Sequence, residues 1–414
     1  MSDIVLSSSV RQNLLSLQST ADLLSTTQTR LATGKKVNSA LDNPTNYFTA
    51  AGLDSRASDI NNLLDGIGNG VQVLQAANTG ITSLQKLVDS AKSIANQALQ
   101  TTAGYSSKAN ATFTGAGTGT GTATADDLTA GGGATGSKLT GAAFTFSMAG
   151  KTAVTVTIGD GTGGTSKSLA DVNKALSDGG ISLTASLDSA GGLTFTSTND
   201  YASQSISAAT TATAGFSTAN TVEIAVAASA ATTSGVNAAV ADVNSQNTRA
   251  NLISQYNQII DQIKTTAQDS SFNGTNLLNG DQLKLVFNET GKSTLNITGV
   301  TFDPAGLGLS TLTGGTDFVD NASTNKVLTS LNNASSTLRS QASTLGSNVS
   351  MVQIRQDFNK NLINVLQTGS ANLTLADTNE EAANSQALST RQSIAVSALA
   401  LANQSQQSVL QLLR

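Results

Sequence analysis

Residues 60–98, INNLLDGIGNGVQVLQAANTGITSLQKLVDSAKSIANQA, carry the pattern that organises this chain. Apolar side chains recur there at alternating spacings of three and four residues, which places one narrow stripe along a helix, as in the seam of a coiled coil. The stripe consists of Ile60, Leu63, Ile67, Gly70, Leu74, Ala77, Ile81, Leu84, Val88, Ala91, Ala95 and Ala98. No proline interrupts it, so we predict a helix from about residue 46 to 102.

A rise of about 1.5 Å per residue makes the stretch ~58 Å long, so its stripe requires helical partners of similar length. The alternative is a long helix within an ordinary bundle. Gly70 is the one gap in the stripe, and it predicts a close approach of another helix or a small bend.

The amino-acid composition excludes most familiar kinds of enzyme active site. The 414 residues include no Cys, His or Trp, and the formal net charge is −5. Disulfides, thiolate metal sites and Cys nucleophiles are therefore excluded, and the commonest general base is missing. The acidic balance argues against a nucleic-acid partner. We expect a protein that is not an enzyme, with no catalytic residue, cofactor or metal site.

The beginning of the sequence, MSDIVLSSSVRQNLL, lacks the basic leader, apolar core and small-residue cleavage site of a secretory signal. There is also no run of 18 apolar residues, so we expect no membrane insertion. These features predict a chain that stays in the cytoplasm or is exported with its amino terminus uncut.

The two ends of the chain share a polar, weakly charged amphipathic pattern. Residues 1–33 and 317–414 both read as helical, with a polar patch at 368–372. A second seam recurs at multiples of seven residues, at Leu331, Leu338, Leu345, Val352 and Leu366. It matches the first seam in length and supplies its internal partner.

A connector is predicted between the first helix and the long one, over residues 34–46. Gly34 is a helix stop, and Asn38, Asp42 and Pro44 favour turn or extended backbone.

The terminal helices carry too few large aliphatic residues to offset the entropy of ordering them alone. We therefore predict that both ends are disordered in the monomer and fold on assembly. The candidate self-assembly residues are Val10, Leu14, Leu17, Leu24, Leu31, Ile394, Leu401, Leu412 and Leu413.

The middle of the chain differs in composition and reads as a separate module. Residues 105–246 are rich in Gly, Ala, Ser and Thr. Period-two alternation predicts strands at 143–148, 151–158, 181–187 and 193–197, and residues 169–177 form a short amphipathic helix pattern.

Helix returns at 247–268, followed by two strand runs that predict a hairpin at about 283–300. The fold class is multidomain α+β. A long coiled-coil or bundle core is formed by both chain ends, with a β-hairpin in the rod and an inserted β-rich outer domain.

The chain resembles bacterial flagellin in two stretches at the expected distances from its ends. The first is LATGKKVNSALDNPTNYFTAAGL, from Leu31 to Leu53, and the second is LALANQSQQSVLQLLR, from Leu399 to Arg414. The resemblance covers residues 1–104 and 247–414.

The resemblance implies three parts. Residues 1–41 and 376–414 would be terminal helices of an inner filament tube, with residues 34–46 as connector. Residues 42–104 and 247–375 would be a helical rod, and residues 105–246 a variable outer domain. Leu169 to Ser207 is similar to the small repeat of flagellin outer modules, a short helix followed by a hairpin.

The resemblance also implies a structural subunit that polymerises into the extracellular helical filament used for swimming. Its partners would be many copies of itself or sister flagellins, the type III export apparatus, an export chaperone, the filament cap and hook-junction proteins. The alternatives are a hook–filament junction protein, or a secreted enzyme or adhesin with a coiled-coil stalk.

Two positions depart from the family pattern. Thr378 follows Ala376 and Asp377 where the family commonly has Ala-Asp-Tyr, which leaves the start of the last helix open. Ser90 stands where flagellins detected by the animal innate receptor carry an Arg, which predicts weak or no detection.

Three weaker motifs have simpler interpretations. GTGGTSKS, Gly161 to Ser168, falls one residue short of a phosphate-binding loop and lies in Gly/Thr-rich sequence. The sequon at Asn288 to Thr290 is better interpreted as a hairpin turn. Glu380 and Glu381 are expected to be solvated or to lie between subunits rather than to act as an acid/base pair.

Overall fold

The computed structural model describes residues 8–102, 104–115, 121–130, 137, 139–209, 221–226 and 231–412. The chain divides into two compact units. The terminal unit contains residues 1–72, 283–297 and 347–414, and the central unit contains residues 73–282 and 298–346. Two helices, α2 (Pro44–Gln100) and α5 (Asn321–Thr374), contribute to both units.

The stripe predicted on residues 60–98 is buried along nearly its whole length. α2 is one helix of 57 residues. It begins at Pro44, whose missing N–H is tolerated in the first turn of a helix. Every stripe residue from Leu74 onward is fully buried, and Leu63 is half-buried. A Cβ at Gly70 would collide with the side chain of Leu285, so another element does approach closely there. The neighbour is a β-hairpin rather than a helix.

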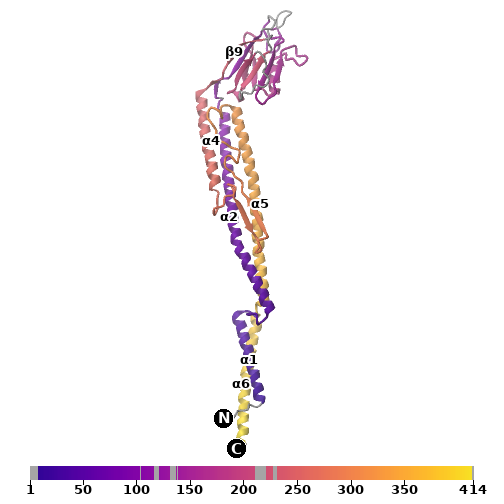
Figure 1. Cartoon of the computed structure of the whole chain (residues 1–414), viewed down its shortest axis with the longest axis vertical. Coiled ribbons are helices and arrows are strands. Elements are labelled where there is room, and N and C mark those ends of the chain that lie inside the picture. Colours follow the sequence, from indigo (N-terminus) through magenta and orange to yellow (C-terminus); the bar gives the residue numbers. More distant parts are fainter. Residues whose placement is uncertain are drawn as a thin grey trace. The chain divides into compact units, whose positions relative to one another are not determined.

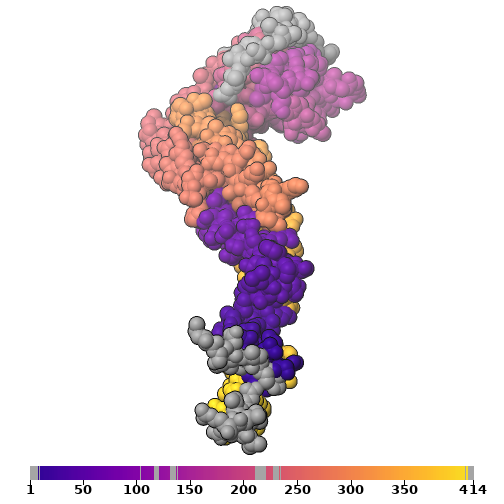
Figure 2. All heavy atoms as spheres, turned by 60° about the horizontal axis from the view of Figure 1, so that its bottom comes forward, coloured from indigo at the N-terminus to yellow at the C-terminus, as the bar shows by residue number. Residues whose placement is uncertain are grey.

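The terminal unit holds the two ends of the chain and most of that hairpin. α1 (Ser8–Thr33) and α6 (Thr378–Leu412) lie side by side (Figure 1). The hairpin pairs β11 (Gln282–Val286) with β12 (Thr294–Thr298), as predicted. A small cluster of Ala57, Ile60, Ile363 and Leu366 joins α2 to α5. Indigo and purple residues of α1 and α2 cover much of the face of this unit shown in Figure 2.

The second seam is also buried, and it contains a polar residue that the heptad pattern skips. Leu331, Leu338, Leu345, Val352 and Leu366 on α5 are all buried. The missing member of the series is Asn359, which is buried as well and donates from Nδ2 to the carbonyl oxygen of Phe287 at 3.0 Å. The hairpin therefore satisfies the one amide in an otherwise apolar seam.

The central unit places α4 (Val243–Asp269) beside the later part of α2 and the first part of α5 (Figure 1). Asp242 caps α4 by accepting from the backbone N–H of Ser245. At the end of α2, the buried Arg249 of α4 donates to the carbonyl oxygens of Thr101 at 3.1 Å, Thr102 at 3.3 Å and Phe318 at 2.6 Å.

Within its described residues, the β-rich module of the central unit has two four-stranded sheets, of order β5-β6-β2-β9 and β4-β3-β8-β7, and a two-stranded ribbon of β1 and β10. The strands are β1 Tyr105–Ser107, β2 Asn110–Gly115, β3 Ala143–Met148, β4 Val154–Thr157, β5 Leu183–Leu187, β6 Leu193–Ser197, β7 Ser205–Ala209, β8 Thr221–Val226, β9 Ala231–Asn237 and β10 Val240–Ala241. Described pairs are antiparallel except β7–β8.

Aromatic rings hold the two sheets together. Across the two sheets, Phe113 of β2 meets Phe144 of β3, and Phe195 of β6 meets both Phe144 and Phe146 of β3, all edge to face with centroids 4.9 to 5.4 Å apart. α3 (Leu169–Asp178) covers this core with Val172 and Leu176. Ser168 and Asp171 form a capping box at its start, which explains why the local sequence alone predicts this helix.

The observed boundaries correct several predicted ones. The helical pattern of residues 317–414 is divided between α5, which ends at Thr374, and α6, which starts at Thr378, close to the expected start of the terminal helix at residue 376. The polar patch at 368–372 is helical and lies before the break. The strand expected at 151–158 is limited to β4, and α4 begins at Val243 rather than residue 247. A 3₁₀ turn, Asn199–Tyr201, follows the predicted helix and hairpin of the outer module.

Candidate functional site

The paired terminal helices are the candidate site because they divide their apolar residues between two faces. One face of α6 is half-buried at positions three and four residues apart, namely Ser385, Leu388, Gln392, Ala395, Leu399 and Ala402. On α1 the corresponding face includes Leu17, Leu24 and Thr27. Small and polar side chains thus make up much of the contact between the two helices.

Several other large aliphatic side chains lie on the opposite faces and remain exposed. On α6, Ile394 and Leu401 are 63% and 70% exposed, and Val396 is also exposed. On α1, the exposed residues are Leu14, Leu15, Leu23 and Leu31. Single exposed aliphatics are ordinary on a protein surface, but seven on one helix pair form a surface that water solvates poorly.

The predicted interface residues therefore fall into two groups. Val10, Leu17 and Leu24 are buried or half-buried within the chain, whereas Leu14, Leu31, Ile394 and Leu401 are exposed. Leu412 ends α6 and its side chain is not among those described, and Leu413 lies outside the described residues. Sequence reasoning missed Leu15, Leu23 and Val396. Their spacing places them outside the apolar stripe of each helix, and this could have indicated that they have no partner there.

A second exposed stripe runs along the α5 portion of the terminal unit. Met351, Ile354, Phe358 and Val365 are exposed and follow helical spacings of three, four and seven residues. They lie beside the buried series that contains Val352 and Leu366. The helix thus has one apolar stripe inside the unit and another facing outward.

The connector between α1 and α2 is anchored by backbone hydrogen bonds. Gly34 adopts φ +68°, where a side chain would be strained, and ends α1. Its carbonyl oxygen accepts from the N–H of Ala376 at 2.9 Å, and the N–H of Lys36 donates to the carbonyl oxygen of Thr374 at 2.7 Å. These contacts tie the turn after α1 to the break between α5 and α6.

Asp42 organises the rest of the connector. Its Oδ2 accepts from the backbone N–H groups of Asn38 at 3.0 Å and Ser39 at 2.9 Å. These two bonds, that of Ser39 first, hold the pKa of the Asp42 carboxyl below its usual value. Pro44 then starts α2. The predicted connector residues Gly34, Asn38, Asp42 and Pro44 thus lie in one turn system, which ends slightly earlier than residue 46.

The start of α6 is set by Asp377 and Glu381. Oδ1 of Asp377 accepts from the N–H of Asn379 at 2.9 Å, which caps the helix. Glu381 is nearly buried, and its Oε1 lies 3.3 Å from Nη1 of Arg30. Glu381 therefore pairs across the two terminal helices within one chain rather than with solvent.

The weaker motifs have local structural roles. In the segment from Gly161 to Ser168, Nζ of Lys167 lies 3.6 Å from Asp127 and Ser168 caps α3. Asn288 forms the hairpin turn by donating to Oγ1 of Thr290 at 2.6 Å. Among the residues that the structure describes, none of the helices is long and apolar enough to cross a membrane, and no group of three acidic side chains could hold a metal ion.

Comparisons with known proteins address the two ends of the chain. The family described as bacterial flagellin N-terminal helical region matches residues 5–114. The family described as bacterial flagellin C-terminal helical region matches residues 328–413. The two matches include all of α1, α2 and α6, and most of α5.

Curated flagellins are similar over part of their length. Flagellin FljM of Caulobacter vibrioides is 33% identical over 165 residues, which is 39% of this chain and 59% of the relative. Flagellin FljK of the same organism is 32% identical over the same shares of the two chains. Flagellin A of Rhizobium meliloti is 39% identical over 77 residues, 19% of this chain and 20% of the relative. The chain thus spans less than two thirds of the relatives it matches.

Both terminal helical regions are matched, each at its own end of the sequence and over the helices that form the candidate site. The chain is similar to bacterial flagellins at both of its ends.

Proposed function

We propose that this chain is a structural subunit that polymerises into the helical flagellar filament used for swimming. The observation that carries the proposal is the exposed aliphatic surface of the α1–α6 pair, which includes Leu15, Ile394 and Leu401. Each such side chain contributes about 2 kcal/mol when it is transferred from water to an apolar contact. Many copies packed together would bury this surface, whereas one chain leaves it in water.

Assembly by this surface requires heterologous contacts. The exposed residues of α1 and α6 differ from those of α5, so the patch on one subunit meets a different patch on the next. Such contacts extend into a helical polymer when they do not close into a ring. The α5 stripe of Met351, Ile354, Phe358 and Val365 supplies a second surface for neighbouring copies.

Folding of the terminal helices is coupled to this assembly. Their mutual contact is rich in small and polar residues, so it contributes little against the entropy of ordering two helices. Limited proteolysis of the monomer should cut the chain ends first, and filaments should protect the same sites. Ends that resist the protease in the monomer would contradict the coupling.

The three-part division predicted from the sequence belongs to this proposal. The terminal helices would form the inner tube, the α2–α4–α5 helices with the hairpin the rod, and the β-rich module the outer domain. The partners would be copies of the chain or sister flagellins, with the export apparatus, chaperone, cap and hook-junction proteins acting before or at assembly. The assembled subunit would be extracellular.

Extension of seeded filaments tests the function. Purified chain is added to sheared filament fragments, and their length is followed by negative-stain microscopy. We expect the unaltered chain to extend the fragments and Leu401→Gln to raise the critical concentration about tenfold or more, because a lost leucine contact costs at least ~1.4 kcal/mol.

The matched control is Val243→Gln, which changes an equally exposed aliphatic residue at the start of α4, outside the proposed surface. It should extend fragments normally. Failure of the unaltered chain to extend any fragment would refute the filament role. Binding to fragment ends without extension would instead identify a junction protein.

A further inference from the structure

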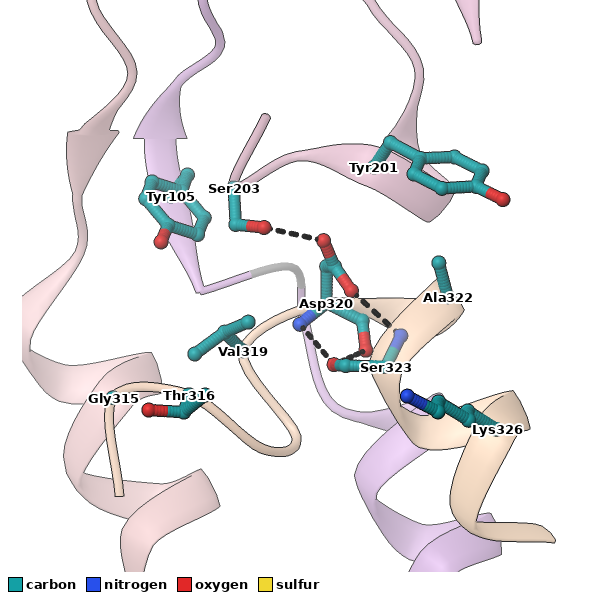
Figure 3. A pocket seen from close by; sticks show the side chains of 10 residues that line it. All are labelled: Tyr105, Tyr201, Ser203, Gly315, Thr316, Val319, Asp320, Ala322, Ser323 and Lys326. Atoms are coloured by element: carbon teal, nitrogen blue, oxygen red, sulfur yellow. Dashed lines mark hydrogen bonds between the residues drawn. The ribbon is translucent and has the colours of Figure 1, made fainter. Parts of the chain in front are cut away.

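The central unit contains a hollow that is not part of the proposed assembly surface. It has a volume of about 700 Å³ and lies where β1, the 3₁₀ turn and the beginning of α5 meet (Figure 3). Its walls include Tyr105, Tyr201, Thr316, Asp320, Ser323 and Lys326. A volume of this size is typical of sites for small molecules.

The wall of the hollow is pre-formed by hydrogen bonds around Asp320. This residue is 3% exposed. Its Oδ2 accepts from the hydroxyl of Ser203 at 2.6 Å, and its Oδ1 accepts from the N–H of Ser323 at 2.9 Å. Asn321 donates to Oδ1 of Asp200 at 3.2 Å. These bonds hold the outer module and the first turn of α5 in one arrangement, so a ligand would not have to organise the site.

The polar groups of the hollow offer one charge of each sign together with hydroxyls. Asp320 supplies a carboxylate whose oxygens can each accept a further hydrogen bond. Lys326 has no described carboxylate within 4.0 Å, so its ammonium remains available as a donor. Burial, with a smaller effect of the Asp320 charge, raises the pKa of Tyr105 and keeps its phenol protonated as a donor.

Apolar surface lies between these polar groups. Figure 3 places Tyr105 and Tyr201 on opposite sides of Asp320, with Val319 and Ala322 close to it. An anion would face the carboxylate of Asp320 and a cation would face Lys326, so a ligand with net charge is disfavoured. Aromatic rings combined with donors and acceptors suit a sugar ring, which presents both C–H faces and hydroxyls.

We propose that this hollow, lined by Tyr105, Tyr201, Asp320 and Lys326, is a binding site for a neutral saccharide. The tyrosine rings contact the C–H face of the sugar, Asp320 accepts from its hydroxyls, and Lys326 donates to them. The site adds a ligand-binding activity to the central unit and does not depend on polymerisation.

Saturation-transfer NMR on the full chain tests the proposal. The probes are maltotriose and the trimer of N-acetylglucosamine as neutral saccharides, with glucose 6-phosphate and glucosamine as charged comparators. We expect transfer to at least one neutral probe and weaker transfer to both charged sugars. Lys326→Ala and Tyr201→Ala should each weaken binding about tenfold, the size expected for one charge-assisted hydrogen bond or one ring contact.

Lys292→Ala is the matched control, because Lys292 is an exposed lysine in the hairpin turn of the terminal unit. It should bind like the unaltered chain. Three results would each overturn the proposal. The first is no transfer to either neutral probe at 10 mM, about the weakest affinity of interest. The others are unchanged binding in both pocket variants and tighter binding of a charged sugar. Filament extension is measured on the same variants and should be unchanged, so failure of the saccharide site is distinguishable from failure of assembly.

Discussion

Arg249→Ala should open the junction between α2, α4 and the segment before α5. The guanidinium is 1% exposed and donates to three carbonyl oxygens, those of Thr101, Thr102 and Phe318. Phe318 is buried and holds φ +53°, a backbone conformation that costs a non-glycine residue about 1 kcal/mol or more. Arg249 thus satisfies two carbonyls just after the end of α2 and holds a strained residue in the segment before α5.

The magnitude follows from those three bonds. A hydrogen bond from a charged donor contributes roughly 1.5–3 kcal/mol, and an orphaned buried carbonyl costs about 1–3 kcal/mol. Removing the guanidinium also removes the free-energy cost of burying its charge. The same burial lowers the pKa of Arg249. We therefore expect a net loss of about 3 kcal/mol for the alanine variant, and a smaller loss for Arg249→Lys, whose ammonium cannot reach all three acceptors.

Native-state hydrogen exchange measures this loss locally, which is necessary because a chain of two units need not unfold in one step. Amides in the first turns of α4 and in residues 313–320 should exchange about 100-fold faster, the equivalent of ~3 kcal/mol. Arg339→Ala, an exposed arginine on α5, is the control and should change exchange little. The reasoning would be refuted if these amides in Arg249→Ala exchanged within threefold of their rates in the unaltered chain, because that corresponds to a loss of about 0.7 kcal/mol or less.

Two further predictions concern the terminal unit. Asn359→Ala should loosen the hairpin by about 2 kcal/mol, because the carbonyl of Phe287 loses its donor and a small cavity remains; unchanged exchange protection of β11 and β12 would contradict this. The connector should weaken in acid, because the folded pKa of Asp42 is lower than its ordinary value of 3.8. Its contribution is complete above that value and is lost as the pH falls through the lower folded-state pKa. Amide exchange of Asn38 and Ser39, corrected for intrinsic rates, should therefore accelerate in acid in the unaltered chain, whereas Asp42→Asn should remove that dependence.

Parts of the fold that depend on neighbouring residues along the chain were predictable. The stripe from Ile60 to Ala98 is a helix because its spacing is helical, and its burial follows from its being apolar. α3 was predicted within one residue because its apolar spacing and following glycines lie in the local sequence, and Ser168 and Asp171 form its cap. The hairpin was predictable because its turn lies between two alternating runs.

The candidate site was predicted only in part. The ends were identified as amphipathic, but the division of their leucines between an inner and an outer face depends on which side of α1 meets α6. Leu17 and Leu24 therefore lie on the half-buried side, while Leu14 and Leu31 are exposed. The same dependence explains why Glu381 was expected to be solvated or to lie between subunits, since its partner Arg30 is 351 residues away in the sequence.

The sequence by itself determined the long helices, the hairpin and the similarity to flagellins at both ends. Those features follow from periodicity, turn residues and composition, which are properties of short windows of chain. Only the tertiary structure decided the sheet order, the polar position Asn359 in the α5 seam, and the buried Arg249 with its three acceptors. A polar side chain is stable in a core only when a carbonyl from a distant segment meets it, and no local pattern records where that carbonyl lies.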